Sequence, residues 1–453
     1  MAESSRQDKA ARQLKLLSDA LDSGRLGPVR RMVNSLSPAE IGNLLESLPP
    51  AKRTIVWGLV DAEDDGEVLV HVGEEVREGL LAAMDTDEIV AAAESLDIDD
   101  LAELMEDLPD QVIDEVLRSM DRENRERLEQ VLSYPEDSAG RLMNPDVVTV
   151  RADVTVEVVL RYLRLRGEVP DNTDHLFVVG RRRQYLGRIP LTALLLSEPG
   201  KPVNQLIDED DQGAIAVDTL TAEVAKQFEI HDWISAPVVD ENNTLLGRIT
   251  IDDVVDIIRE QAEHQVMSAA GLDEEEDMFS PVPRAARRRI IWLGINLGTA
   301  FLAASVVGRF EATIEQVVAL AVLMPIVAGM GGNAGTQVLA LMIRGLALGQ
   351  VSSANVRVLL WKEFRVALLN GLALGALLGF IVWLWFSNIA LSGVIFAALV
   401  ITLCCAAIAG VAVPLALRRM GFDPALASSI FLTTVTDVMG FFAFLGLGTW
   451  LLL

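Results

Sequence analysis

Hydrophobic positions over the first ~130 residues recur at helical spacing, and the pattern occurs twice. The segment SPAEIGNLLESLPPAKRTIVWGLVD, residues 37–61, matches DIDDLAELMEDLPDQVIDEVLRSMD, residues 97–121, at an offset of 60 positions. A proline after Leu48 and another after Leu108 divide each copy into two short helices. We therefore expect an all-α, superhelical array of helix pairs, in which each pair buries its apolar face against the next.

A second repeat follows at the same offset and has a different period. LFVVGRRRQYLGRIPLTALL, residues 176–195, parallels APVVDENNTLLGRITIDDVV, residues 236–255. Each copy has the pattern of a strand, a polar turn, a glycine-containing strand and the start of a helix. This predicts a tandem α/β pair of βαβ type, whose usual role is sensing, because the internal symmetry creates a cleft between the copies.

From Arg287 onward, long apolar runs predict five membrane helices. Each run supplies about 20 residues, which is enough to cross a ~30 Å hydrocarbon core. The expected spans lie near residues 289–308, 313–342, 366–386, 392–416 and 425–451.

Basic residues decide the expected orientation of these spans, because cytoplasmic loops are enriched in lysine and arginine. All but Arg309, which stands beside Glu311, fall on one side, and this side is predicted to be cytoplasmic. The segment VRVLLWKEFR, residues 356–365, is predicted as an amphipathic helix on the inner surface before the third span. The basic residues on that side are Arg284, Arg287, Arg288, Arg289, Arg344, Arg357, Lys362, Arg365, Arg418 and Arg419.

Composition separates the chain into two halves. Hydrophobic residues make up 51% of the sequence, yet the formal net charge is −27. Only five acidic residues follow Ile290, whereas the region before Pro283 holds 60 acidic and 27 basic residues. That acidic half matches cations and is a poor match to nucleic acid. The N-terminus lacks the apolar core of a signal peptide, so we expect the acidic half to stay in the cytoplasm.

One acidic residue, Asp437, lies near the midpoint of the fifth predicted span, in TTVTDVMGF. A charge there costs at least ~2.5–3.5 kcal/mol, so such residues normally face a bundle interior or a water-filled path. The remaining predicted spans contain no lysine, arginine or histidine in their cores to pair with it. A cation site is the favoured interpretation, and the competing one is a protonated aspartate that is hydrogen-bonded to a neighbouring helix.

The second span contains MPIVAGMGGNAGTQ, residues 324–337, in which glycines and Pro325 surround Asn333. A break at proline and glycine would free backbone carbonyls toward a cavity, and the amide oxygen of Asn333 would add to them. Ordinary small-residue packing is the competing interpretation. Together with Asp437, the segment predicts an oxygen-lined pore for hard divalent cations, and these arguments do not separate Mg²⁺ from Ca²⁺ or Mn²⁺.

These residues carry a resemblance to the MgtE family of magnesium channels over nearly the whole chain. The segments similar to family signatures are GGNAGTQ at 331–337, FDPALASSIFLTTVTDVMGF at 422–441, and YPEDSAGRLMNPDVVTVRADVTVEVVLRYLR at 134–164. The resemblance implies a multidomain membrane protein. Its soluble part would consist of an all-α superhelical N domain at 1–132 and tandem α/β CBS domains at 133–258 (about 138–198 and 199–258). A connecting plug helix with its linker at 259–283 would lead into a five-helix transmembrane pore domain at 284–453.

The resemblance also implies roles for particular residues. Family members form a homodimer with the pore between subunits, where Asp437 would hold hydrated Mg²⁺, Asn333 would line the same path and Asp423 would lie near its cytoplasmic end. Cytosolic Mg²⁺ would bridge the helical domain, the CBS pair and the plug helix and hold the pore shut. Each regulatory residue could instead belong to a solvated acidic face. By motif, the implied regulatory ligands are Asp99, Glu103, Asp232, Asp253 and Asp256.

Two departures from the family pattern stand out. The plug helix has Gln261, His264 and Gln265 where the family is rich in glutamate, so Mg²⁺-dependent closure is expected to be weaker, shifted or absent. An acidic run follows at 273–277. The second CBS copy keeps Thr250 with Asp253, but the first copy, at 190–193, lacks the Arg-Asp of ATP-binding relatives, so ATP is not expected to bind.

The leading prediction is a homodimeric channel of a bacterial inner membrane that takes up Mg²⁺ passively, with its soluble domains in the cytoplasm and its C-terminus outside. An intramembrane aspartyl protease would need two carboxylates at one site, and the chain offers one deep aspartate, so no enzyme activity is expected. A pore-less membrane sensor of CBS type is a competing prediction. A coupled exporter of divalent cations is another, although coupled carriers typically show internal repeats among their spans and none is evident here.

Overall fold

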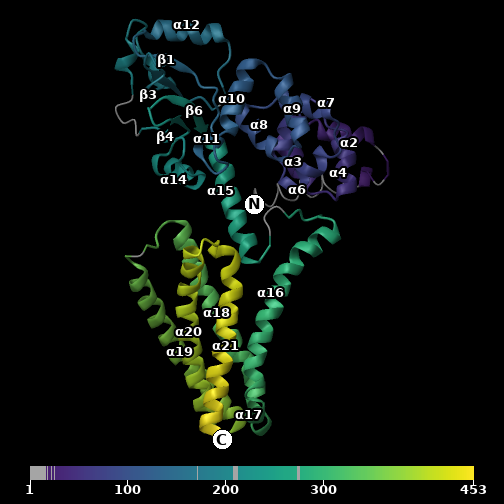
Figure 1. Ribbon diagram of the computed structural model, residues 1–453, viewed down its shortest axis with the longest axis vertical. Helices are drawn as coiled ribbons and strands as arrows, with labels where there is room; N and C mark the ends of the chain where they lie inside the picture. The colour runs from purple at the N-terminus through teal and green to yellow at the C-terminus, as the bar shows by residue number, and fades with distance from the viewer. Residues whose placement is uncertain are drawn as a thin grey trace. The chain divides into compact units, whose positions relative to one another are not determined.

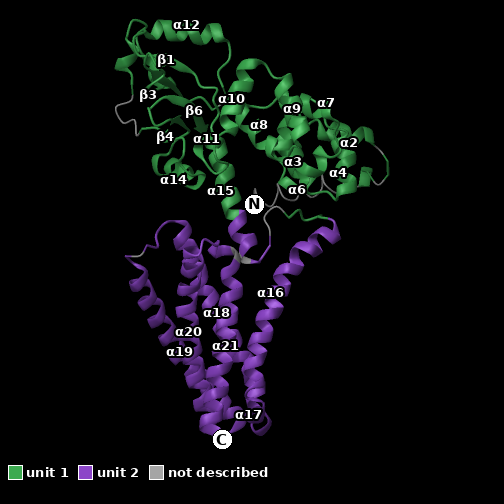
Figure 2. Ribbon diagram, viewed as in Figure 1, with its two compact units in different colours: residues 1–262, 275–280 green, residues 263–274, 281–453 purple. Residues whose placement is uncertain are grey.

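The computed structural model describes residues 17, 19–21, 23–24, 26–170, 172–207, 213–272, 276–352 and 354–453. The chain divides into two units, coloured separately in Figure 2. Unit 1 comprises residues 1–262 with 275–280, and unit 2 comprises residues 263–274 with 281–453. Of the acidic run at 273–277, the first three residues lie outside the described residues.

Short helices separated by prolines and capped turns build the N-terminal part of unit 1 (Figure 1). Pro49 separates α3 from α4, and Pro109 separates η1 from α9, so the expected helix pairs are confirmed. Ser37 caps α3 and Asp85 caps α7, each in a reciprocal capping box with a glutamate three residues later. The elements are α2 (Leu26–Val33), α3 (Pro38–Glu46), α4 (Pro50–Trp57), α5 (Asp65–Val70), α6 (Glu74–Leu81), α7 (Thr86–Glu94), α8 (Ile98–Leu104), η1 (Met105–Asp107), α9 (Asp110–Ser119), α10 (Arg122–Leu132) and α11 (Ala139–Leu142).

The repeat positions form the core of this helical domain. Ile41 and Val56 of the first copy are buried, as are Leu101 and Val116 of the second. Full burial of such a side chain contributes about 1.5–3 kcal/mol. The helical spacing of these residues, rather than the charged residues between them, therefore determines how the helix pairs stack.

Two three-stranded sheets follow, and they are built alike. In each sheet the first strand is parallel and the last antiparallel to the central one, giving the orders β1-β2-β3 and β4-β5-β6. A bulge falls between Val178 and Val179 in the first sheet and between Val238 and Val239 in the second, so the 60-residue repeat holds to the residue. The elements are β1 (Thr149–Arg151), α12 (Val156–Arg166), β2 (His175–Val179), β3 (Tyr185–Pro190), α13 (Leu191–Leu196), η2 (Val203–Gln205), β4 (Ile215–Ala216), α14 (Thr221–His231), β5 (Ser235–Val239), β6 (Leu245–Thr250) and α15 (Ile251–Ala269).

The helical domain and the second sheet module share one hydrophobic core within unit 1. Leu128 and Val131 of α10 belong to the same buried cluster as Phe228 of α14. Asn144 adds an antiparallel backbone bridge to Arg248 in β6. The second module is thus fixed to the helical domain by both apolar burial and backbone pairing.

The segment 276–280 lies against the helical domain of unit 1. Nη2 of the buried Arg53, in α4, lies 2.8 Å from Oδ2 of Asp277, and the same guanidinium donates to two backbone carbonyls of the preceding turn. The backbone N–H of Asp277 and the hydroxyl of Ser280 both donate to Oε2 of Glu75 in α6, at 3.1 and 2.5 Å. A buried polar network therefore holds this segment in place.

Unit 2 contains five helices that are long and apolar enough to cross a membrane, as expected. α20 is the central one, because 61% of its apolar stretch is buried and it packs on α18, α19 and α21. The helices of unit 2 are α16 (Val282–Gly308), α17 (Glu311–Gln316), α18 (Ala319–Ala347), α19 (Val356–Phe386), α20 (Ile389–Arg419) and α21 (Pro424–Leu452) (Figure 1).

Three local expectations for this part were wrong. α18 begins at Ala319, after the separate short helix α17, and it continues through Pro325 and the glycines without the expected break. The segment 356–365 is the first part of α19 rather than a separate surface helix. An unbroken helix satisfies its backbone N–H and C=O groups internally, and lipid offers these groups no partner.

Glycines bring α18 close to α20 and α21. A Cβ at Gly331 would lie 2.6 Å from Cγ2 of Thr402, and one at Gly335 would lie 3.0 Å from Leu432. A Cβ at Gly410 of α20 would likewise lie 2.9 Å from Cβ of Val338 in α18. Gly331 and Gly335 therefore serve helix packing, which was the competing interpretation of this motif, whereas a Cβ at Gly329 or Gly332 would meet no atom within 4 Å.

The variant Gly331→Ala is expected to lower the stability of the helix bundle by about 1–3 kcal/mol, because the added methyl group overpacks a buried contact. The measurement is the midpoint of thermal unfolding of the purified protein in detergent. Gly393→Ala in α20 is the matched control, since its Cβ would meet no atom within 4 Å. Equal midpoints for the two variants would contradict the packing role of Gly331.

Candidate functional site

Asp437 lies near the middle of α21, as the sequence predicted, and its side chain is partly buried. Its neighbour Thr436 is fully buried and faces Gly331 of α18. Among the described residues, no hydrogen-bond or ion-pair partner neutralises the Asp437 carboxylate. A carboxylate held at this depth without a protein partner can be balanced by a cation or by a proton.

Asn333 lies at nearly the same depth as Asp437. Gly331 faces Thr436 and Gly335 faces Leu432, so α18 and α21 run antiparallel and Asn333 is level with about residue 434. At 1.5 Å per residue, Asp437 stands roughly 4–5 Å further along the bundle axis. The two predicted pore residues therefore occupy one level of unit 2.

The face of α18 that carries Asn333 is polar and uncovered in the single chain. Asn333, Thr336 and Gln337 are all exposed within a membrane-spanning helix. Amide side chains facing hydrocarbon lose their hydrogen bonds with water, which costs several kcal/mol each in apolar surroundings. This face is suited to line an aqueous path.

Asp423 caps the start of α21 and contacts the end of α15. Its Oδ1 accepts from the backbone N–H of Ala425 at 2.8 Å, and its Oδ2 lies 2.7 Å from Nε2 of His264. Both His264 and Asp423 belong to unit 2. His264 thus contacts Asp423, the residue predicted to lie near the cytoplasmic end of the pore, directly.

A second acidic site forms in unit 1, where α8 faces α15. Burial, reinforced by the nearby charge of Asp253, raises the pKa of Asp99 well above its ordinary value. The same two causes raise the pKa of Asp100 to about 7. Burial is also the largest cause that raises the pKa of Asp253, to about 6. These carboxylates crowd one another without enough cationic partners.

Asp256 and Glu260 extend this acidic face along α15. Burial raises the pKa of both, and the charge of Glu103 contributes in each case. Glu103 itself is paired with Nη1 of Arg77 at 2.6 Å. Within the described residues, no three histidine, cysteine, aspartate or glutamate side chains are arranged to hold one metal ion. The acidic face therefore gathers charge without presenting a closed coordination site.

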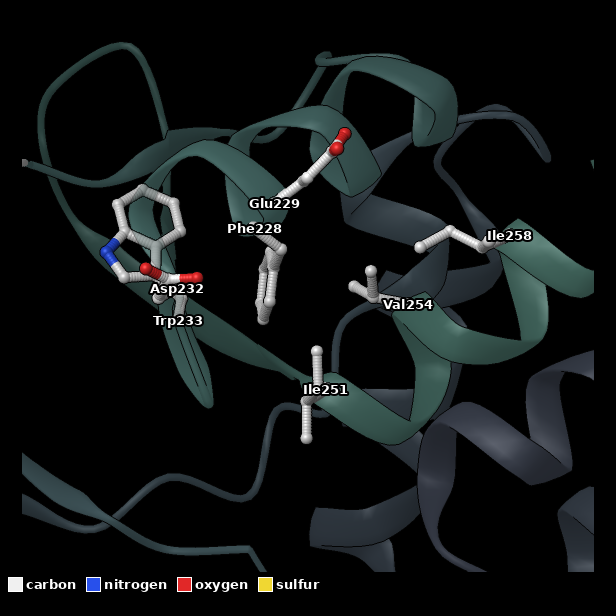
Figure 3. Close-up of a pocket in the computed structure, with 7 residues that line it drawn as sticks. All are labelled: Phe228, Glu229, Asp232, Trp233, Ile251, Val254 and Ile258. Atoms are coloured by element: carbon white, nitrogen blue, oxygen red, sulfur yellow. The ribbon is translucent and has the colours of Figure 1, made fainter.

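Asp232, the remaining predicted residue, lies apart from that face. It ends α14 in a left-handed conformation, with φ 52°. Figure 3 shows it beside Trp233, and both residues line a mainly apolar pocket together with Val254 and Ile258 of α15. The volume of this pocket is about 360 Å³. Residues 254 and 258 share one side of α15, whereas Asp253 and Asp256 lie on another, so Asp232 is not part of the acidic face.

Sequence reasoning missed two members of the acidic face, Asp100 and Glu260. Both had a usable signal. Asp100 follows the predicted Asp99 in the first turn of α8, and Glu260 stands one helical turn after the predicted Asp256. The pairing of Glu103 with Arg77 had no such signal, because the two residues are 26 positions apart on different helices.

Three comparisons with known proteins bear on these sites. The model of the divalent cation transporter family named MgtE matches residues 324–447, that of the MgtE intracellular N domain matches 36–137, and that of the CBS domain matches 139–198 and 214–260. Together these matches cover the acidic face in unit 1 and the level of Asp437 in unit 2.

Curated relatives match over almost their whole length. The chain is 31% identical to the magnesium transporter MgtE of Thermus thermophilus, covering 96% of this chain and 98% of that protein, and 30% identical to the one of Bacillus subtilis, covering 95% of each. A solved structure of the cytosolic domain of the Mg²⁺ channel MgtE in complex with ATP is 29% identical over 53% of this chain and 98% of that one, with a TM-score of 0.49. The chain belongs to the MgtE family of magnesium transporters.

Proposed function

We propose that this protein is a passive Mg²⁺ channel, with Asp437 as the site of a hydrated ion. The observation that carries the proposal is the Asp437 carboxylate, which has no neutralising partner among the described residues and shares its depth in the bundle with the amide of Asn333. Mg²⁺ sheds water reluctantly and is usually held by one or two carboxylates with much of its hydration shell kept. Curated relatives named as magnesium transporters support this choice of ion.

The pore is proposed to lie between two copies of the chain. The polar face of α18, with Asn333, Thr336 and Gln337, is uncovered in the single chain and would be unfavourable against lipid. A twofold arrangement places the same face of each copy against its counterpart. Two Asp437 carboxylates would then face one aqueous path, and together they would balance the charge of a divalent ion.

We further propose an inner-membrane location with the acidic half in the cytoplasm. Arginines lie in the first turns of α16 and α19 and in the last turns of α18 and α20, and by the positive-inside rule this supports a cytoplasmic position for these four helix ends. With five spans, the C-terminus then lies outside. A potential of 100 mV is worth ~2.3 kcal/mol per elementary charge, so inward flow of a divalent ion requires no additional energy source.

The test is uptake by the full-length protein in liposomes with a Mg²⁺-sensitive dye inside. An inside-negative potential is expected to drive Mg²⁺ uptake, and dissipating the potential is expected to slow it. The proposal would be contradicted if no Mg²⁺ entered the liposomes when the Mg²⁺ concentration is low on the side that carries the acidic half of the protein. That result would favour a pore-less sensor. Uptake that requires a proton or sodium gradient would contradict it in favour of a coupled carrier.

Cytosolic Mg²⁺ is proposed to regulate the pore by binding at the acidic face formed by Asp99, Glu103, Asp253 and Asp256. Mutual repulsion and burial disfavour the ionised state of this face, so a divalent ion that binds there stabilises the packing of α8 on α15. Asp232 is proposed as a separate, pocket-edge position. We also propose that ATP does not bind to the CBS pair. Titration of ATP into the full-length protein tests this, and measurable binding of ATP would contradict it.

Regulation at the acidic face is expected to depend on pH. Carboxyls with raised pKa values stay protonated in the packed state to higher pH, so without Mg²⁺ the contact between α8 and α15 loses stability as pH rises from about 4 to about 7. Mg²⁺ competes with those protons, so its apparent affinity should be higher at pH 7 than at pH 6, by up to about tenfold for each carboxyl that is still protonated in this range. Hydrogen exchange in α8 measures both effects, and an affinity that is unchanged in this range would contradict the assignment.

His264 is expected to hold the end of the plug helix at the pore through Asp423 without a bridging ion. In His264→Ala this 2.7 Å contact is lost, so Mg²⁺ flux at high cytosolic Mg²⁺ should rise several-fold. The measurement compares liposome flux at low and high Mg²⁺. Gln265→Ala, one residue further along the helix, is the control and should behave like the wild type; equal closure in both variants would contradict the role of His264.

A further inference from the structure

One face at the start of α19 combines basic side chains with an exposed tryptophan. Arg357, Trp361 and Arg365 recur every four residues and thus share one side of the helix, with Lys362 beside them. The Arg365 guanidinium lies 5.9 Å from the ring centroid of Trp361, and 55% of Trp361 is exposed. These four residues are called the α19 basic face below.

The positive charges of Arg357 and Arg365, two members of this face, are not cancelled by an ion pair within the described residues. The nearby acid, Glu363, is buried and lies 2.6 Å from Nζ of Lys362, so that pair is neutral. No carboxylate among the described residues forms an ion pair with Arg357 or Arg365. Both guanidinium groups are therefore available to an anionic partner.

Neighbouring helix ends add to the same charge. α19 and α20 run antiparallel, because Gly371 packs on Val400 and Gly379 packs on Ser392. The end of α20, with the exposed Arg418 and Arg419, is therefore at the same end of the bundle as the start of α19. Arg418 and Arg419 thus add positive charge to the end of the bundle that carries the α19 basic face.

The position of this face along α19 matches the depth of lipid headgroups. Trp383 follows Trp361 by 22 residues on the same helix and is also exposed, at 46%. At 1.5 Å per residue the two tryptophans are separated by roughly 33 Å, close to the ~30 Å of a hydrocarbon core. Tryptophans favour the two membrane interfaces, so Arg357 and Arg365 lie within about one turn of an interface.

We propose that the α19 basic face binds the headgroup of an anionic phospholipid. The guanidinium groups would donate paired hydrogen bonds to the phosphate, while Trp361 would pack against the glycerol and upper acyl chain. The acidic half of the chain is the competing occupant. Lipid is favoured because the face continues directly into the exposed apolar surface of α19, which includes Leu369, Leu377 and Phe380.

The test counts lipids bound to the full-length detergent-purified protein by native mass spectrometry, with phosphatidylglycerol or phosphatidylcholine added. The wild type is expected to bind phosphatidylglycerol at least tenfold more tightly than phosphatidylcholine. The double variant Arg357→Gln with Arg365→Gln should abolish that preference. The matched control is Arg309→Gln, which removes the arginine that directly follows α16 and is not part of the α19 basic face. This variant should leave the preference for phosphatidylglycerol intact. An unchanged preference in the double variant would overturn the proposal, as would equal competition by inorganic phosphate.

Two further variants keep the test decisive. Arg357→Lys with Arg365→Lys retains the charge and should retain most of the preference, which separates loss of binding from loss of folding. In liposomes, the Arg357→Lys variant also allows carbodiimide crosslinking to carboxylates. Crosslinks to carboxylates of residues 26–272 would show that the acidic half occupies this face, and this result would overturn the proposal. The inference does not depend on transport, because every readout is a binding or crosslinking measurement.

Discussion

The variant Asp437→Asn is expected to reduce Mg²⁺ flux about 100-fold or more. Asparagine has nearly the same shape but carries no charge, so the variant removes the electrostatic attraction for the ion while leaving the packing of α21 intact. A charge at mid-membrane depth costs at least ~2.5–3.5 kcal/mol, which a bound cation would offset. Since 1.4 kcal/mol corresponds to a factor of ten, loss of this interaction corresponds to about two powers of ten.

Two controls separate the pore from general damage. Asp437→Glu retains the carboxylate at nearly the same depth and should keep measurable flux. Glu311→Gln removes a carboxylate from the start of α17, outside the membrane spans, and should change flux less than about twofold, because exposed charges act weakly at a distance. If Asp437→Asn carries Mg²⁺ at the rate of the wild type, Asp437 is not the ion site.

The variant Asp277→Asn is expected to produce the largest local loss of stability in unit 1. Asp277 and Arg53 form a 2.8 Å ion pair with side chains only 6% and 7% exposed. Removing one partner of a buried pair leaves an uncompensated charge and costs about 3–5 kcal/mol. Amides of α4 that exchange by local opening should therefore exchange at least ~100-fold faster with deuterium.

The exposed pair of Arg30 with Asp61 provides the matched control. These two side chains lie 3.3 Å apart and are 62% and 50% exposed. Asp61→Asn should cost less than about 1 kcal/mol, because solvent screens an exposed pair. If the two variants change exchange in α4 equally, the segment 276–280 is not anchored through Arg53.

Much of the architecture was predictable because the helical part and the sheet part each contain a sequence repeat. The proline after Leu48 and the proline after Leu108 each end one helix, and the structure has the breaks at both. The two sheets share even the position of the bulge, at Val178 and at Val238. A repeat constrains fold because both copies must satisfy the same packing with the same pattern.

Two wrong predictions in unit 2, a break in α18 and a separate surface helix at 356–365, followed from local residue preferences alone. Pro325 and its neighbouring glycines indicate a break by their intrinsic preferences, yet α18 is continuous. The charged residues within 356–365 indicated a surface helix, yet α19 runs through them because its buried side, with Glu363 and Ala367, packs inside the bundle. In both cases tertiary contact and backbone satisfaction outweighed the local pattern.

The candidate sites were predictable to different degrees. Asp437 stands out because a lone charge in an apolar span is costly wherever the span packs. By contrast, the contact of His264 with Asp423 joins residues 159 positions apart, and the pair of Arg53 with Asp277 joins residues 224 positions apart. No periodicity connects such positions, so only the folded chain brings them together.

The most direct test of the central claim is a recording of single-channel currents from the purified protein in a planar bilayer, with Mg²⁺ as the permeant cation. A passive channel should give discrete current steps that reverse at the Mg²⁺ equilibrium potential and disappear in Asp437→Ala. Steps that persist unchanged in Asp437→Ala, or Mg²⁺ uptake into liposomes without any current steps, would contradict a channel built around Asp437.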